Sequence, residues 1–199
     1  KVLGPEHPDT LTSVSQLGSV LARQGKYAEA ETMHQQALKG REKVLGPEHP
    51  DTLTSVNNLG SVLDDQGKYA EAGDMHRRAL QGYKKVLGPV HPNTLTSMHN
   101  LAYTLKAQGN ISQALDLIKK CADLRNGVLG SDHPQTISSF NALSDWETAA
   151  NQPSESQSQL HSSDLPNIPS VQTYAGNHTA SASKPVSRKR RILTNLFRR

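Results

Sequence analysis

The sequence predicts an all-α solenoid of antiparallel helix pairs over residues 1–150, followed by a disordered tail over residues 151–199. Two observations carry this prediction: a unit of 42 residues that repeats, and a change of composition where the tail begins. Residues 2–43 and 44–85 agree at 31 of 42 positions, and residues 86–127 agree with the second unit at 17 positions. Self-similarity at a fixed period of this length is typical of a stacked array in which each unit buries one face on its neighbour.

A fourth unit, residues 128–150, is only partly kept. It retains one apolar helical pattern that ends near Trp146, the only tryptophan of the chain, and no second helical pattern follows. We therefore expect one helix that caps the exposed end of the third unit, with Trp146 packed against that end. The first four residues match residues 43–46, which close a unit, and this match predicts a fragment of a longer array.

Each unit has the pattern of two helices. In the second unit, Pro50 disfavours helical backbone in the residue before it, and Asp51 is the expected N-cap of the first helix. Gly67 should end this helix, since glycine adopts the left-handed closing conformation readily. The second helix has an apolar stripe formed by Ala70, Ala72, Met75, Ala79 and Leu80. The short link between the two helices predicts antiparallel neighbours.

The net charge of +4 comes from the tail. Residues 151–199 hold seven Lys and Arg against two Asp and Glu, while residues 1–150 hold 15 against 16. The basic residues that lie together in the tail are Arg188, Lys189, Arg190 and Arg191. Three interpretations stay open: a nuclear-import signal, a patch for anionic membrane or nucleic acid, and a solvated end without a specific role. Disorder is expected before the cluster, because a polar Ser- and Pro-rich segment cannot bury enough surface to offset its ordering entropy.

The single cysteine, Cys121, suits a reducing compartment. Neither a secretory signal nor an apolar run of transmembrane length is found in the sequence, so we expect a cytoplasmic protein, or a nuclear one through the basic cluster. Cys121 stands where the first two units have Ala37 and Ala79, which predicts a small packed side chain rather than a reactive thiol.

The histidines do not predict a metal site. Four connector histidines recur at the period of the repeat: His7, His49, His91 and His133. Stacked helices place equivalent positions roughly 8–10 Å apart, whereas two ligands of one zinc ion lie about 4 Å apart. These side chains should instead fix the connectors by hydrogen bonds. His34 and His76 are expected at partly exposed positions of the second helices, also in a structural role.

No arrangement of residues predicts catalysis. The sequence has no nucleophile–base pair and no glycine-rich phosphate loop, and the adjacent Asp64 and Asp65 do not face each other on a helix. We therefore expect a non-enzymatic protein without a cofactor, a metal or a small-molecule substrate.

The spacing within the unit resembles the tetratricopeptide repeat. The second unit has that family's signature residues at Leu59, Gly60, Gly67, Tyr69, Ala72, Ala79 and Leu80. The period of 42, instead of the family's usual 34, and the VLGPEHPDT connector are similar to the repeats of kinesin light chains. The resemblance covers residues 1–150. It implies a right-handed superhelix whose first helices line a concave groove, and an adaptor that binds peptide segments there.

The resemblance also implies which residues face the groove. The candidates are Ser15, Arg23, Asn57, Ser61, Asp64, His99, Tyr103, Lys106 and Asn141, with Thr12, Ser19, Thr54, Asp65, Thr96, Ser138 and Asp145 at neighbouring positions. Asn57 and Asn141 stand where the family often uses asparagine to hold the backbone of a peptide. An amide there can donate and accept hydrogen bonds at once, which suits an extended ligand.

Three functional hypotheses stay open. A kinesin-light-chain-like adaptor would bind the kinesin heavy chain or cargo, but the heptad coiled coil of that family is absent here. Only three full units are present, about half the usual number. The second hypothesis is the sensor arm of a fungal or bacterial nucleotide-binding signalling NTPase, and the third is a nuclear or membrane-targeted scaffold that uses the tail. Heptads upstream of Lys1 would favour the first hypothesis, and a phosphate-binding loop would favour the second.

Overall fold

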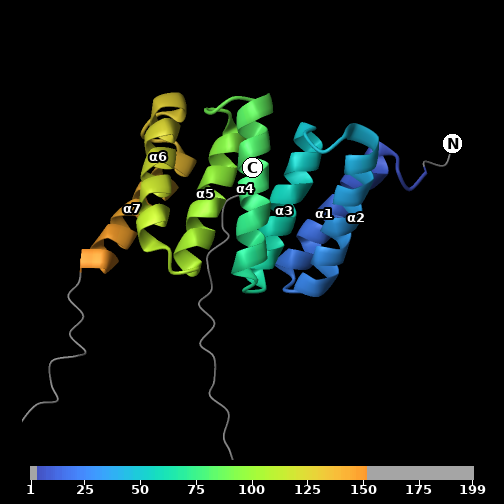
Figure 1. Cartoon of the computed structure of the whole chain (residues 1–199), viewed down its shortest axis with the longest axis horizontal. Helices are drawn as coiled ribbons and strands as arrows, with labels where there is room; N and C mark the ends of the chain where they lie inside the picture. Colours follow the sequence, from blue (N-terminus) through green and yellow to red (C-terminus); the bar gives the residue numbers. More distant parts are fainter. Residues whose placement is uncertain (1–3, 152–199) are drawn as a thin grey trace, which may run out of the picture. The chain divides into compact units, whose positions relative to one another are not determined.

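The computed structural model describes residues 4–151, and this part of the chain contains seven α-helices and no strand. The helices are α1 (Pro8–Arg23), α2 (Tyr27–Leu45), α3 (Pro50–Asp65), α4 (Tyr69–Val86), α5 (Pro92–Ala107), α6 (Ile111–Leu129) and α7 (Pro134–Asn151). Figure 1 shows the helix pairs side by side, from α1 and α2 at one end to α7 at the other. The predicted solenoid of helix pairs is confirmed. None of these helices combines the length and apolar character that crossing a membrane would require.

The helices form two layers. Each second helix packs between two first helices, that of its own unit and that of the next, so α2 contacts α1 and α3, and α4 contacts α3 and α5. The first helices also contact one another, α1 with α3 and α3 with α5. Because the first helices lie closest together, they form the inner side of the array, and α2, α4 and α6 form the outer side.

Each first helix begins at a proline whose preceding histidine is the cap. The backbone N–H of Asp51 donates to His49 Nδ1 at 3.2 Å, and His7, His91 and His133 accept in the same way at the same distance. Proline forces the residue before it into extended backbone, here φ −66° and ψ 139°, so the histidine takes the N-cap position. The expectation that Asp51 is the N-cap is therefore wrong, because Asp51 lies in the first turn. The hydrogen-bonding role of the connector histidines is confirmed.

The turn between the paired helices depends on a glycine. Gly67 has φ 77°, in the left-handed region that other residues rarely adopt, and the next backbone N–H, that of Lys68, donates to the Leu63 carbonyl at 2.9 Å. The second helix then returns along the first. Its Ala72 and Ala79 are fully buried at the close approach, whereas Ala70 of the predicted apolar stripe is exposed.

Trp146 and Cys121 lie where the sequence predicted. Trp146 and Ala142 of α7 belong to the same buried cluster as Ile118 and Cys121 of α6. The α7 helix thus caps the third unit, as predicted. Cys121 is fully buried as a small packed side chain, and burial raises the pKa of its thiol.

His34 and His76 are buried, so the expectation of partly exposed side chains is wrong. The reason is a glycine on the facing helix: a Cβ at Gly60 would lie 2.8 Å from His76 Cε1, and one at Gly18 would lie 2.9 Å from His34 Nε2. The missing side chain leaves room that the imidazole fills. In the third unit, Ala102 stands in place of the glycine and Ile118 in place of the histidine.

Candidate functional site

A buried polar network joins the second unit to the third. His76 Nδ1 lies 3.1 Å from Asn57 Oδ1, and its Nε2 lies 3.1 Å from Asp64 Oδ2. From the next unit, the Ser97 hydroxyl donates to Asn57 Oδ1 at 3.1 Å and the Thr104 hydroxyl donates to Asp64 Oδ2 at 2.8 Å. Two predicted groove residues, Asn57 and Asp64, thus use acceptor atoms inside the array. Their first role is to hold α3, α4 and α5 together.

A second network joins the third unit to α7. The buried Arg125 donates to the Gln135 carbonyl at 3.1 Å and to the Ser139 hydroxyl at 2.8 Å, and it contacts His99 Nδ1 at 3.2 Å. Burial, and then the Arg125 charge, lower the pKa of His99 to about 4. His99 is therefore neutral at pH 7. Because Nδ1 accepts from Arg125, its proton lies on Nε2.

Beside this network lies a cluster that we call the aromatic platform, defined as His99, Tyr103, Lys106 and Trp146. The His99 and Tyr103 ring centroids are 4.8 Å apart, and those of Tyr103 and Trp146 are 4.9 Å apart in an edge-to-face arrangement. Lys106 Nζ lies 4.6 Å from the centroid of the Trp146 ring. Trp146 is 5% exposed and Tyr103 is 38% exposed. The platform therefore presents one accessible aromatic ring, that of Tyr103, which packs against the buried ring of Trp146.

The platform lies on first helices, α5 and α7, and hence on the inner side of the array. Asn141 and Asp145 are exposed on α7, and Asp65 is exposed at the end of α3. Burial, and then the negative charge of Asp145, raise the pKa of Tyr103. The surroundings of the accessible ring are thus polar.

The other predicted groove residues differ in accessibility. Ser15 is only 6% exposed, so its side chain is not available to a ligand in this structure. Arg23 is exposed in the last turn of α1, at the opposite end of the array from the platform. Ser61 is half-buried, and its hydroxyl donates to the Asn57 carbonyl at 3.2 Å. Whether any of these residues binds a ligand stays a prediction, and the basic cluster at residues 188–191 lies outside the described residues.

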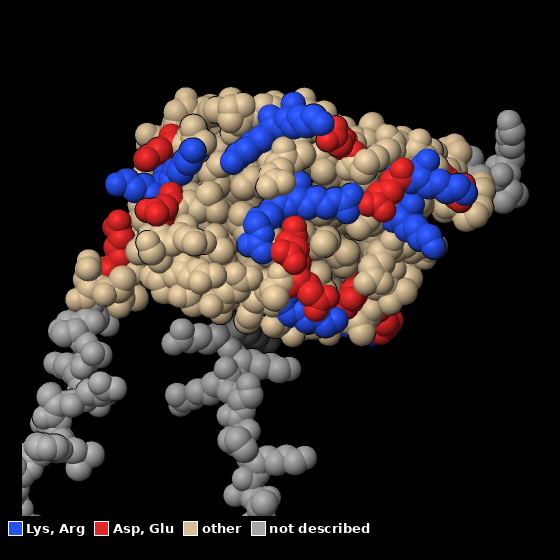
Figure 2. Space-filling model, in the orientation of Figure 1, with Lys and Arg blue, Asp and Glu red and all other residues tan. Residues whose placement is uncertain are grey.

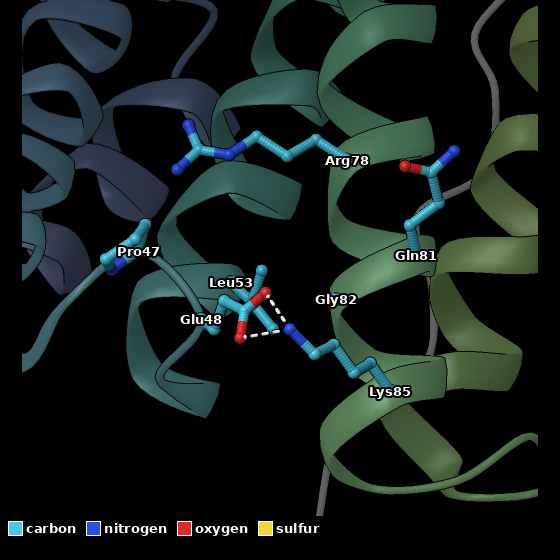
Figure 3. A pocket seen from close by; sticks show the side chains of 7 residues that line it. All are labelled: Pro47, Glu48, Leu53, Arg78, Gln81, Gly82 and Lys85. Atoms are coloured by element: carbon cyan, nitrogen blue, oxygen red, sulfur yellow. Dashed lines mark hydrogen bonds and ion pairs between the residues drawn. The ribbon is translucent and has the colours of Figure 1, made fainter.

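One pocket of about 390 Å³ opens on the outer side, between the second connector and α4 (Figure 3). Its lining residues are Pro47, Glu48, Leu53, Arg78, Gln81, Gly82 and Lys85. A Cβ at Gly82 would lie 2.5 Å from Leu53 Cδ2, so a larger residue here requires the Leu53 side chain to move. The third unit has Leu124 at this position. Lys85 pairs with Glu48 at 2.6 Å across the pocket, and Arg78 pairs with Glu42 at 2.6 Å. These ion pairs neutralise charged groups that line the pocket.

Basic and acidic side chains also lie next to one another on other parts of the surface. Figure 2 shows blue and red groups next to one another over one face of the array, without a large area of one sign. The Lys43–Glu6 pair at 2.5 Å repeats the Lys85–Glu48 pair one unit earlier. Such exposed pairs contribute little stability, roughly 0–1 kcal/mol each. In the described part of the chain, no group of three or more His, Cys, Asp or Glu is placed to hold a metal ion.

A family model for the tetratricopeptide repeat matches residues 9–85 and, in an overlapping match, residues 55–126. The chain belongs to the tetratricopeptide repeat family. Proteins of this family are generally non-catalytic modules that bind protein partners. No curated protein matches the sequence of this chain.

Solved structures extend the comparison. Two crystal structures show the nearly identical TPR-like repeats of a candidate kinesin light chain from Podosopora anserina. Both are 29% identical to this chain, and each match spans 78% of this chain and 74% of the other chain. The TM-scores are 0.66 and 0.64. The match to the crystal structure of BtubC (BKLC) from P. vanneervenii spans 79% of this chain and 73% of that chain, with a TM-score of 0.58. The identity is 17%, so this match shows the shared fold alone. The predicted kinesin-light-chain type of repeat is confirmed.

Proposed function

We propose that this tetratricopeptide repeat array is an adaptor that binds an extended segment of a protein partner on its inner side, at the aromatic platform. The observation that carries the proposal is the position of Tyr103, which is 38% exposed while His99 and Trp146 hold its ring. A ring held in this way loses little conformational freedom when a ligand packs on it. Binding energy at protein interfaces is concentrated in such aromatic anchors.

Polar groups that suit an extended ligand lie around the ring. Asn141 is exposed on α7, and its amide can both donate to and accept from the backbone of a peptide. Asn57 is half-buried, and its Oδ1 already accepts from Ser97 and contacts His76, so only its amide nitrogen remains for a ligand. Of the two asparagines, Asn141 is therefore the better candidate for a peptide contact.

An adaptor role is supported by the likeness to the Podosopora anserina candidate kinesin light chain, at 29% identity over 78% of this chain. The three full units carry no glycine-rich phosphate loop or nucleophile–base pair, which agrees with a binding role. Peptide-display selection against the full chain would supply a binding sequence for quantitative work.

The test compares two tyrosines of equal exposure. Tyr103 lies on the inner side, and Tyr69, also 38% exposed, begins the outer helix α4. We expect Tyr103→Ala to weaken binding of the selected peptide by about tenfold or more, since losing an aromatic anchor costs at least ~1–2 kcal/mol. Tyr69→Ala should leave the affinity unchanged. Calorimetric titration of both variants, with helicity checked by circular dichroism, decides the matter.

Two outcomes would reject the proposal. Equal affinities of the parent and Tyr103→Ala would remove the platform from the binding site. A loss in Tyr69→Ala alone would move the site to the outer side of the array.

A further inference from the structure

We propose that α7 binds an amphipathic helix of a protein partner, in the place that α2, α4 and α6 take on the other first helices. The surface concerned, which we call the open face of α7, is defined as Ile137, Phe140, Ser144 and Glu147. These residues follow one another at spacings of three and four, so they lie on one side of the helix. The open face is distinct from the aromatic platform, because Trp146 packs towards α6.

The equivalent face of the earlier first helices is covered by the second helix of the same unit. Leu53 and Leu95 stand at the position of Ile137 and are 2% and 1% exposed. A Cβ at Gly82 of α4 would lie 2.5 Å from Leu53 Cδ2, and the Cys121 thiol of α6 donates to the Leu95 carbonyl at 3.3 Å. Close contact with a second helix therefore buries this face in the full units.

The open face of α7 keeps the apolar residues, but no second helix follows α7 within residues 4–151. Ile137 is 44% exposed and Phe140 is 37% exposed. Val56 and Met98, which stand at the position of Phe140, are at most 1% exposed. Two large apolar side chains one helical turn apart thus lie uncovered together, and such grouped apolar residues are typical of a surface that contacts another protein.

The full units show which kind of helix fits such a face. Each second helix has two fully buried small residues seven positions apart. These pairs are Ala30 with Ala37, Ala72 with Ala79, and Ala114 with Cys121. Residues at this spacing lie on one side of a helix, two turns apart, and small side chains there let two helices approach closely. A partner helix with the same pattern can pack on Ile137 and Phe140, antiparallel to α7.

The charge of α7 adds a second requirement. Glu147 stands where α1, α3 and α5 have leucine, and α7 contains no Lys or Arg. Only residues 108–110 separate α5 from α6, so the first turn of a second helix lies beside the end of its first helix. The first turn of the partner helix would likewise lie beside Glu147, where a basic side chain and the positive end of the helix dipole attract the carboxylate. The partner helix therefore combines small residues on its contacting side with a basic first turn.

The array itself supplies the probe for this face. The first peptide is fluorescein-labelled and has the sequence of α6, residues 111–129, with Cys121→Ala to prevent oxidation. A second peptide also carries Ser112→Lys and Gln113→Lys, which make its first turn basic. A third has the residues of the first in scrambled order. Fluorescence anisotropy measures the binding of each peptide to the full chain.

We expect the lysine peptide to bind about threefold more tightly than the α6 peptide, and the scrambled peptide about tenfold more weakly. Ile137→Asp should weaken both helical peptides by about tenfold or more, because it places a carboxylate in an apolar contact. Leu17→Asp, the matched control, changes an apolar residue of α1 that is 49% exposed and should leave the affinities unchanged. Glu147→Leu should remove the advantage of the lysine peptide. Circular dichroism checks the helicity of each variant.

Several results would overturn the inference. Equal affinities of the scrambled and α6 peptides would show that helix packing plays no part, and a loss in Leu17→Asp alone would place the peptide on α1. If serine at Ile192, Leu193, Leu196 and Phe197 lets the α6 peptide bind about tenfold more tightly, the chain's own C-terminal segment occupies the open face instead of a partner. If Ile137→Asp abolishes self-association of the chain in sedimentation, the occupant is a second copy.

The open face and the aromatic platform are tested separately. Tyr103→Ala should leave binding of the α6 peptide unchanged, because Tyr103 lies on α5 and is no part of the open face. A loss of α6-peptide binding in this variant, with none in Ile137→Asp, would move the helix to the platform and overturn the inference for α7.

Discussion

His34 and His76 occupy equivalent positions in two units that agree at 31 of 42 positions, yet their surroundings differ. Both rings are buried beneath a glycine. His34 Nδ1 has no hydrogen-bond partner, and burial, followed by the Arg41 charge, lowers the pKa of this side chain. Both nitrogens of His76, by contrast, face oxygen atoms, Asn57 Oδ1 and Asp64 Oδ2. The same residue in the same backbone is a packing element in one unit and the centre of a polar network in the next.

The difference arises from the facing helix. The first unit has Ser15 and Ala22 where the second has Asn57 and Asp64, so it lacks the oxygen atoms that reach the ring. The third unit completes the network, because Ser97 and Thr104 donate to these oxygens from α5. A few residues that differ between the units therefore determine whether a polar network forms at a junction. The residues that the units share determine the helix pairs.

The largest expected effect separates the two histidines directly. His76→Ala removes a buried side chain and one polar contact each from Asn57 Oδ1 and Asp64 Oδ2, so we expect a loss of about 3–5 kcal/mol in the free energy of unfolding. His34→Ala removes packing alone, and its cost should be lower by about 1–3 kcal/mol. Urea titration followed by circular dichroism measures both. Equal losses would mean that the polar network adds nothing to packing.

The second prediction concerns the loss of stability at low pH. His99 has a pKa of about 4 in the folded state against about 6.5 when unfolded, so the unfolded chain binds its proton first as the pH falls. The stabilisation is complete above pH 6.5 and decreases towards pH 4, by up to about 3 kcal/mol. His99→Asn, which introduces the residue found at the equivalent positions 57 and 141, should flatten this part of the stability curve. Urea midpoints of parent and variant between pH 7 and pH 4 test this, and parallel curves would exclude His99 as the source.

The smallest expected effect compares two buried threonine hydroxyls. Thr104 donates to Asp64 at 2.8 Å, whereas the Thr52 hydroxyl is buried without a hydrogen-bond partner. Thr104→Val should destabilise the array by about 1 kcal/mol, because it removes one of the two polar groups that contact Asp64 Oδ2, the other being His76 Nε2. Thr52→Val should be neutral or stabilising, since it replaces an unsatisfied hydroxyl with a methyl group. If the two variants shift the urea midpoint in the same direction and by the same amount, the Thr104 hydrogen bond contributes nothing.

The fold could be predicted from the sequence because it depends on features that recur. The strict period, the glycine at each turn between paired helices and the proline at the start of each first helix determine the helix pairs. The N-cap was misassigned because Asp51 has a strong general preference for that position, while Pro50 shifts the position by two residues to His49.

The site could be predicted only in part, because side chains from different units meet there. Register along the first helices indicated His99, Tyr103 and Lys106, which do lie together. It did not show that Trp146 would join them from α7, since this residue was assigned to packing alone. Nor did it show that Asn57 and Asp64 face the fully buried His76. A polar Thr104 at the place of the apolar Val62 was a signal that a hydrogen-bond acceptor lay opposite.

The glycine that faces His76 constrains how the sequences of the repeats can diverge. Gly60 and His76 lie on two helices, and a methyl group on the glycine would overlap the ring, so a larger residue at position 60 is compatible with this packing only if position 76 changes as well. The third unit has Ala102 with Ile118, which is such a paired exchange. Sequence drift in this array is therefore epistatic at these positions. Gene conversion, which copies a whole unit at once, would carry both members of the pair together, whereas point mutation would have to pass through an unfavourable intermediate.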